Sequence, residues 1–362
     1  MSDTKVVKCN ILDKDWLRRH PDILIHLELG KAKRLQAAGK IEIIDPVEDS
    51  ISHTVKTYQT KVMTAQAFGY LTRDSYSMKK KSKIAWIQDC SKLNGGAEQS
   101  NSHVVSIGEN LGFDIVGVTP VNFHINILKT ADMVIINNFM EFPFEKFNMI
   151  ISLLYEDRIP YIKYDHDMRE LKRLNISKQL FSQSVKNIFI SPKHMENFID
   201  VIGEQIRNHS ACLPLSINTN LFKKINEVKR IKNTVLVPCS RKDGINIQNY
   251  IEDHPDKEYY FIDQPKLQIP RKAKVEVLPF REIDGMPELY NKYEEMLHLP
   301  VSLWAGERLY FEALLCGCKP VVNDNVGHVS WKIPDKKLKD TLKKAPYKFW
   351  KEVESSIRRH NG

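Results

Sequence analysis

The chain has 362 residues, of which 42% are hydrophobic, 27% charged and 9% aromatic. This composition excludes wholesale disorder, and the length predicts two domains with room for a small appendage. Lysine and arginine outnumber the acids by 54 to 45, and this net charge of +9 favours an anionic partner. Nucleotide, DNA and an anionic membrane are all open, as is the alternative of an ordinary basic surface.

Targeting and redox signals are scarce in the sequence. No apolar run approaches the length of a membrane span, and none follows the charged start. We therefore expect neither integral membrane association nor a secretory signal. The six cysteines are scattered without a CxxC pair, which favours free thiols over a zinc site and predicts a cytoplasmic protein.

Residues 1–82 are predicted to form a small α+β module or arm before the main body. Apolar alternation indicates strands at 23–27 and 41–44, with a short helix at 30–40 between them. The lysine-rich run 79–83 is typical of a linker.

From residue 83 onward, apolar strands alternate with helix-like segments, which is typical of a parallel, doubly wound sheet. Strands are expected at 83–87, 113–118, 133–137, 161–164 and 188–191. The alternation restarts near residue 230, with strands at 234–238, 259–263, 275–278 and 319–323, helices at 286–293 and 309–316, and a short apolar segment at 296–300. The predicted fold class is therefore α/β, with two Rossmann-like domains facing across a cleft and ligand sites at the carboxyl ends of their strands.

Gly95 and Gly96 follow the first strand of this body and open a helix. Glycines there let the backbone approach a ligand closely, and a helix N-terminus favours anions. An ordinary structural turn is the alternative.

His166 stands between Asp165 and Asp167, directly after the strand at 161–164. A histidine flanked by carboxylates at the carboxyl end of a strand is well placed for polar recognition or proton handling. The Asp-X-Asp spacing could also hold Mg²⁺ or Mn²⁺. The alternative is a capping aspartate beside a solvated histidine.

Ser240, Arg241 and Lys242 follow the first strand of the second half. The two cations could neutralise a diphosphate, with the serine adding a hydrogen bond. A plain polar turn explains the same residues.

The segment 306–327 is the richest in chemistry. Glu312 lies in an otherwise apolar helix, where a carboxylate is costly without a partner, and ribose hydroxyls would serve as one. Gly317 ends that helix, and Asn323 to Gly327 form a loop at the carboxyl end of the next strand, where a ligand would lie.

The order of these motifs resembles the GT-B glycosyltransferases, and among them the retaining group called family four. The resemblance covers about residues 83–362 and rests on Gly95-Gly96-Ala97-Glu98, on His166, on Pro214-Leu215-Ser216-Ile217-Asn218 as the interdomain link, and on Glu312-Ala313, Gly317 and Pro320-Val321-Val322. Trp304 stands where the family usually has a second glutamate, and Gly306-Glu307 replaces its Phe-Gly, so Glu307 could substitute.

The resemblance implies a GT-B fold with an acceptor domain at 83–225, a donor domain at 226–340 and a last helix at 341–362 that crosses back. It implies transfer of a sugar from a nucleotide diphosphate-sugar with retention, without cofactor or metal. The expected catalytic residues are Asp165, His166, Arg241 and Lys242. The expected donor-binding residues are Gly95, Gly96, Ser240, Glu307, Arg308, Glu312, Asn325, Val326 and Gly327, the last three through backbone amides.

The acceptor is inferred from where the charge lies. Residues 97–128 contain no lysine or arginine, which argues against a lipid acceptor at that helix, because membrane-associated relatives carry basic residues there. Arg169, Lys172 and Arg173 follow His166 and are expected to contact the acceptor. The extra N-terminal module resembles bacteriophage-encoded glycosyltransferases, so double-stranded DNA with hydroxymethylated bases is the preferred acceptor. A cell-envelope polysaccharide and a non-catalytic nucleotide- or DNA-binding module are the alternatives.

Overall fold

The protein is described here by a computed structural model, in which contacts divide the chain into two compact units, Met1–Ser77 and Met78–Gly362. The structure describes the backbone of residues 6–11, 25–28 and 41–46 and, in the second unit, residues 82–89, 96–138, 141–168, 174–238, 244–262, 264–265 and 267–361.

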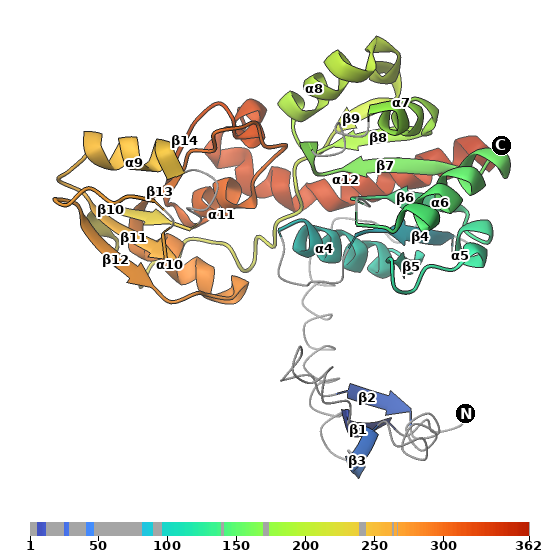
Figure 1. Cartoon of the computed structure of the whole chain (residues 1–362), viewed down its shortest axis with the longest axis horizontal. Helices are drawn as coiled ribbons and strands as arrows, with labels where there is room; N and C mark the ends of the chain where they lie inside the picture. Colours follow the sequence, from blue (N-terminus) through green and yellow to red (C-terminus); the bar gives the residue numbers. More distant parts are fainter. Residues whose placement is uncertain are drawn as a thin grey trace. The chain divides into compact units, whose positions relative to one another are not determined.

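The first unit holds a three-stranded antiparallel sheet of β1 (Val6–Ile11), β2 (Ile25–Glu28) and β3 (Ile41–Pro46), with β1 in the centre (Figure 1). Two of these strands lie where apolar alternation predicts them, whereas β1 is not predicted from the sequence. The helix expected at 30–40 lies outside the described residues.

The second unit begins with a six-stranded parallel sheet in the order β5-β4-β6-β7-β8-β9. Its strands are β4 (Lys83–Ile87), β5 (Asp114–Val118), β6 (Met133–Ile136), β7 (Tyr161–Asp165), β8 (Lys186–Phe189) and β9 (Ser210–Cys212). The central strands are buried on both faces, which is why they are continuous apolar runs.

Helices cover both faces of this sheet (Figure 1). They are α4 (Gly96–Asn110), α5 (Ile125–Lys129), α6 (Phe144–Glu156), α7 (Leu174–Gln183), α8 (Pro192–Ile202) and the 3₁₀ helix η3 (Glu204–His209). Trp86 of β4 faces one core and its neighbours Ala85 and Ile87 face the other, as the alternation of a strand requires.

A second parallel sheet has five strands in the order β12-β11-β10-β13-β14. They are β10 (Ile231–Val237), β11 (Glu258–Ile262), β12 (Lys274–Leu278), β13 (Tyr293–His298) and β14 (Lys319–Val322), joined through α9 (Gly244–Asp253), η4 (Ile283–Gly285), α10 (Met286–Lys292), α11 (Arg308–Cys316) and η5 (Gly327–Trp331). Of the apolar segment expected at 296–300, residues 296–298 belong to β13, which begins three residues earlier.

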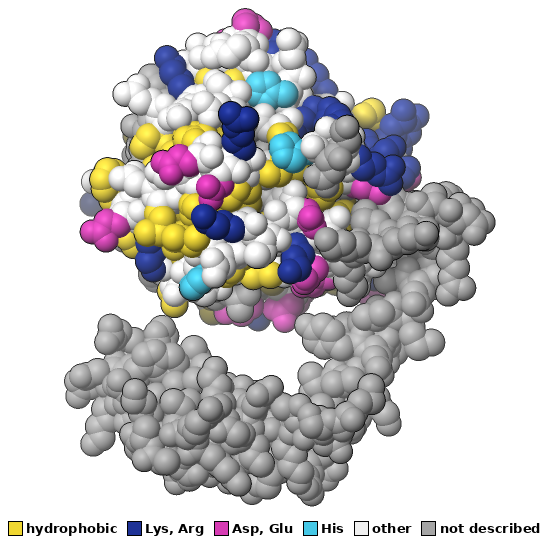
Figure 2. Space-filling view, turned by 90° about the vertical axis from the view of Figure 1, so that its right-hand side faces the viewer, with side chains coloured by type: hydrophobic (Ala, Val, Ile, Leu, Met, Phe, Trp, Pro, Cys, Tyr) yellow, Lys and Arg dark blue, Asp and Glu magenta, His cyan; other side chains and the backbone are white. Residues whose placement is uncertain are grey.

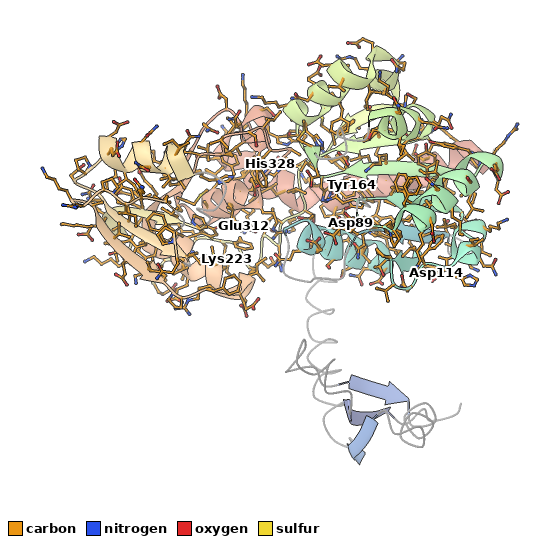
Figure 3. The ribbon with its side chains drawn as sticks, viewed as in Figure 1. Asp89, Asp114, Tyr164, Lys223, Glu312 and His328 are labelled. Carbon is orange, nitrogen blue, oxygen red and sulfur yellow. The ribbon has the colours of Figure 1, made fainter. Side chains whose placement is uncertain are left out.

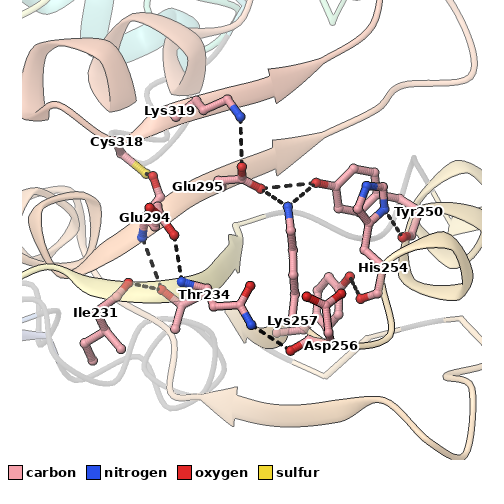
Figure 4. A network of polar contacts seen from close by, with 12 residues as sticks. Ile231, Thr234, Tyr250, His254, Asp256, Lys257, Glu294, Glu295, Cys318 and Lys319 are labelled. Carbon is pink, nitrogen blue, oxygen red and sulfur yellow. Dashed lines mark hydrogen bonds and ion pairs between the residues drawn. The ribbon is translucent and has the colours of Figure 1, made fainter.

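Glu295 of β13 ties this sheet together at a buried polar network (Figure 4). Its carboxylate accepts from Lys257 Nζ at 2.6 Å, Lys319 Nζ at 3.0 Å and the Tyr250 hydroxyl at 3.1 Å. Burial alone raises its pKa, but the two lysines outweigh burial and lower the pKa of Glu295. The network satisfies its own members, so it supports the sheet.

The last helix, α12 (Asp335–Asn361), leaves the second sheet and packs along the first (Figure 1). The indole of Trp350 stacks on Phe113 with centroids 4.5 Å apart and donates from Nε1 to the carbonyl of Val104 at 2.7 Å. A Cβ added at Gly108 would lie 2.2 Å from this indole, so only glycine fits beneath it. The helix therefore joins two domains of the second unit through a close-packed contact: the first domain, built on the six-stranded sheet, and the second domain, built on the five-stranded sheet.

No helix in the described part of the chain is long and apolar enough to cross a membrane.

Candidate active site

A cavity of about 990 Å³ lies between the two sheets of the second unit. The first domain lines it with the opening turn of α4 and the residues that follow β6 and β7. The second domain lines it with the segments that follow β10, β11 and β13, the loop after β12, and the start of α11. Both sheets thus turn the carboxyl ends of their strands toward one site, as parallel α/β domains do at ligand sites.

Asn138 and His166 form the first domain's side of the cavity, one after β6 and the other after the neighbouring β7. They are 9% and 8% exposed. Asn138 Oδ1 and both ring nitrogens of His166 have no hydrogen-bond partner among the described residues. Buried polar atoms without partners are costly, which makes these two residues the candidates for ligand contact on this side of the cavity.

The imidazole of His166 is neutral at physiological pH. Burial lowers the pKa of His166 to about 3, although the neighbouring Asp165 carboxylate opposes the shift. A neutral ring offers one donor and one acceptor, which suits a sugar hydroxyl. The sequence predicts His166 but misses Asn138, whose available signal is an asparagine pair directly after a buried strand.

Asp165 lies beneath the cavity wall that Asn138 and His166 form, rather than in it. Its side chain is fully buried, with Oδ1 accepting from Lys163 Nζ at 2.8 Å and Oδ2 paired with His194 Nε2 at 3.0 Å. Burial alone would raise its pKa, but Lys163 and His194 hold the pKa of the Asp165 carboxyl well below its ordinary value. Both oxygens are thus engaged and Asp165 does not line the cavity, while the catalytic role expected for it stays a prediction.

Glu312 faces the first domain from α11 and lies at the boundary between the domains, as Figure 3 shows. Its carboxylate accepts from Arg308 Nε, one helical turn earlier, at 2.8 Å. Burial raises the pKa of Glu312, and Arg308 opposes that shift. The sequence argument that a buried glutamate needs ribose as its partner is therefore incomplete, because Arg308 already supplies one.

Arg308 connects both domains. Besides Glu312, its guanidinium donates from Nη1 to Ser100 Oγ of α4 at 2.8 Å and to the carbonyl of Ser216, in the interdomain link, at 3.3 Å. A Cβ at Gly96 would lie 3.2 Å from Arg308 Cδ, so the glycine at the start of α4 leaves room for this side chain. We call this set of contacts the Arg308 clasp.

Trp304, Glu307 and His298 also line the cavity from the second domain. Glu307 precedes α11, and its Oε1 lies 4.0 Å from His298 Nε2. The ring of Trp304 stands edge-on to His298, with centroids 6.4 Å apart. Trp304 and His298 are not among the predicted donor residues, but the departure of Trp304 from the family glutamate marks this position in the sequence.

The loop that carries Asn325, Val326 and Gly327 supports the site from behind and does not line the cavity. Its three amides already donate, to Asn323 Oδ1, to the Asn323 carbonyl and to the Trp304 carbonyl. Contact between these amides and phosphate stays a prediction. Gly327 is needed because a Cβ there would lie 2.1 Å from the Ala305 carbonyl oxygen.

Several predicted residues lie outside the described residues, so their contacts stay predictions. They are Gly95, Arg169, Lys172, Arg173, Ser240, Arg241 and Lys242. Their described neighbours Gly96, Met168 and Pro238 all line the cavity. Within the described ranges, no three histidine, cysteine or acidic side chains are grouped so that they could hold a metal ion.

No family model and no curated protein sequence matches this chain. Solved structures do match its fold. Anabaena HepE in complex with UDP is 14% identical, with a TM-score of 0.52 over 77% of this chain and 98% of that chain. An α-glucosyltransferase in complex with UDP and a 13-mer DNA containing an HMU base is 12% identical, with a TM-score of 0.51 over 74% of this chain and 90% of that chain. At these identities the likeness concerns the fold, and it confirms the predicted GT-B architecture of two Rossmann-like domains.

Proposed function

We propose that this chain is a glycosyltransferase that moves a sugar, with retention, from a nucleotide diphosphate-sugar to a hydroxyl of DNA. The observation that carries the proposal is the cavity between the facing strand ends. On one side it presents the Glu312 carboxylate, and on the other the unpartnered Asn138 and His166. Two proteins of this fold, HepE and the α-glucosyltransferase, were solved with UDP.

The second domain is assigned to the donor. Apolar side chains at the end of β11 and after β12, among them Ile262, Phe280 and Ile283, suit a nucleobase. Glu312 then meets the ribose, and the start of α11 supplies amides and a positive dipole end toward the diphosphate. Arg241 and Lys242 are proposed to take the negative charge that grows on the leaving diphosphate.

The first domain is assigned to the transferred sugar and the acceptor. Neutral His166 and Asn138 would hold sugar hydroxyls and orient the anomeric carbon, which lowers the entropic cost of reaching the transition state. No proton transfer by Asp165 is required, because its carboxylate stays paired with Lys163 and His194.

A hydroxymethylated base in duplex DNA is the proposed acceptor. Support comes from the net charge of +9 and from the DNA bound in the α-glucosyltransferase structure. A base inside a duplex must be flipped out before its hydroxyl can enter a cavity of this kind.

The test is a transfer assay with duplex DNA containing hydroxymethylated bases and a panel of nucleotide-sugars, followed by mass spectrometry of the nucleosides. We expect one sugar to be added to the modified nucleoside and none to unmodified DNA. Sugar transfer to a polysaccharide acceptor alone would replace DNA as acceptor. Nucleotide binding without transfer to any acceptor, or hydrolysis of any donor, would indicate a non-catalytic module.

A further inference from the structure

The outward face of α12 carries a stripe of cations. Lys337, Lys344, Lys348, Lys351 and Arg359 are all exposed. At 100° per residue, the five side chains fall within an arc of about 80°. They extend over about 33 Å at the helical rise of about 1.5 Å per residue. We call these five residues the basic stripe.

Packing fixes the direction in which the basic stripe faces. The opposite side of α12 is buried in the core through Leu338, Leu342, Phe349, Trp350 and Val353. Rotation of the helix would therefore expose this apolar face and withdraw the indole from its slot over Gly108. The stripe is held outward by the same contacts that join the two domains.

The stripe is not neutralised locally. None of its four lysines forms an ion pair with a described residue, and the buried Glu354 is paired with Arg358, outside the arc. Asp340 and Glu352 lie just beyond the edges of the arc. Lysines at i and i+4, such as Lys344 and Lys348, repel each other and destabilise a helix, so an ordinary solvated face would gain from alternating signs.

We propose that the basic stripe binds the phosphate backbone of duplex DNA. The proposal rests on the proposed function, because it concerns the acceptor of that same enzyme. The stripe's length of about 33 Å is close to one turn of duplex DNA, about 34 Å, and a duplex presents about one charge per 1.7 Å of its axis. A line of cations of this length can thus meet phosphates on both rims of a groove.

A membrane surface is the competing partner, and the structure favours DNA over it. A helix that lies in a membrane interface buries an apolar face among the lipids. The apolar face of α12 is already buried in the protein, and its exposed large hydrophobic side chain is Tyr347. The end face of the domain where α12 terminates carries acidic and basic side chains interspersed with apolar ones (Figure 2).

The test compares two triple variants of the full chain that lose the same charge. One is Lys344→Gln with Lys348→Gln and Lys351→Gln. The matched control is Lys223→Gln with Lys224→Gln and Lys229→Gln, three exposed lysines in the segment before β10. Binding to a fluorescent duplex of about three turns is followed by anisotropy at several salt concentrations. Circular dichroism and thermal unfolding verify that both variants are folded.

We expect each lost phosphate contact to lower DNA affinity about eightfold at about 0.1 M salt and to flatten the slope of log K against log salt by about 0.9. The stripe variant should thus lose about 500-fold in affinity and about 2.7 in slope. The control should stay within about threefold of wild type, since only long-range charge changes. Equal losses in the two variants would overturn the proposal.

Two further measurements separate this proposal from the proposed function. Stripe-dependent binding to vesicles containing anionic phosphatidylglycerol, with DNA affinity unchanged in the stripe variant, would replace DNA by a membrane surface. If wild type binds DNA through the stripe but transfers no sugar, the function fails and the stripe stands. If both variants bind DNA and transfer sugar as wild type does, the stripe fails and the function stands.

Discussion

Replacing Arg308 by methionine removes the cation that joins Glu312, Ser100 and the Ser216 carbonyl. Methionine keeps most of the side-chain volume, so the change concerns charge and hydrogen bonds more than packing. The variant leaves Glu312, which is 3% exposed, without its cation. Breaking a buried pair by removing one partner costs about 3–5 kcal/mol, and we expect a loss of about 3 kcal/mol in the free energy of unfolding at neutral pH.

The loss in the free energy of unfolding of Arg308→Met should depend on pH, in a direction set by the surroundings of Glu312. Burial already raises the pKa of Glu312, and removing Arg308 removes the main influence that lowers it. A group whose pKa is higher in the folded state stabilises the fold at pH below its unfolded value and loses that contribution as pH rises through the folded value. Arg308→Met should therefore be markedly more destabilised at about pH 8 than at about pH 5.

Urea denaturation at both pH values measures this, with two controls. Ser100→Ala removes one hydrogen bond to the guanidinium and should cost about 1.5–3 kcal/mol with little pH dependence. Adding Glu312→Gln to Arg308→Met removes the stranded charge and should restore most of the stability at pH 8. An equal loss at both pH values, with no rescue by Glu312→Gln, would refute the assignment of Glu312 as the titrating partner.

Four other predictions concern the candidate site. His166→Ala should lower kcat/KM by about tenfold to a hundredfold, because contacts to the sugar are lost. Since the pKa of His166 is about 3, the activity of wild type should show no titration of this group above about pH 5. An inflection near pH 6.5 that vanishes in the variant would contradict this. Its lowered pKa also means that acidification from about pH 6.5 to about pH 3 removes stability from wild type, which thermal unfolding can follow. Glu312→Ala should raise the KM for the donor with a smaller effect on kcat, because contacts to the ribose exist in the ground state and the transition state alike. An unchanged nucleotide affinity, measured by calorimetry, would show that Glu312 does not contact the donor. Treatment with EDTA should leave the rate of transfer unchanged, whereas inhibition reversed by Mn²⁺ would revive the reading of Asp165 and Asp167 as metal ligands.

The fold is largely predictable because its information is local. Buried parallel strands are continuous apolar runs, and their alternation with helices defines a doubly wound sheet before any pairing is known. β1 is missed because a six-residue strand in a small antiparallel sheet carries a weak signal. The pairing of Arg308 with Glu312 could have been found, since charges at i and i+4 share a helix face.

The site is less predictable because its contacts are distant in the sequence. Arg308 and Ser100 are 208 residues apart, and no spacing rule relates them. Asp165 and His194 meet because β7 and the start of α8 pack together. This packing buries a carboxylate that the sequence motif predicts to be at the ligand site. The same three-residue motif thus places His166 and Asp167 in the cavity wall and Asp165 beneath it.

The packing of the Trp350 indole against Gly108 affects how the chain folds during its synthesis. The first domain is synthesised early, yet its core includes Phe349, Trp350 and Val353, which are made only after every strand of the second sheet. Until they leave the ribosome, the surface formed by Gly108, Phe113 and Val104 is open and apolar. A nascent chain of this protein therefore carries an unfinished first domain while the whole second domain is synthesised. A premature stop before Trp350 removes part of the core of the first domain.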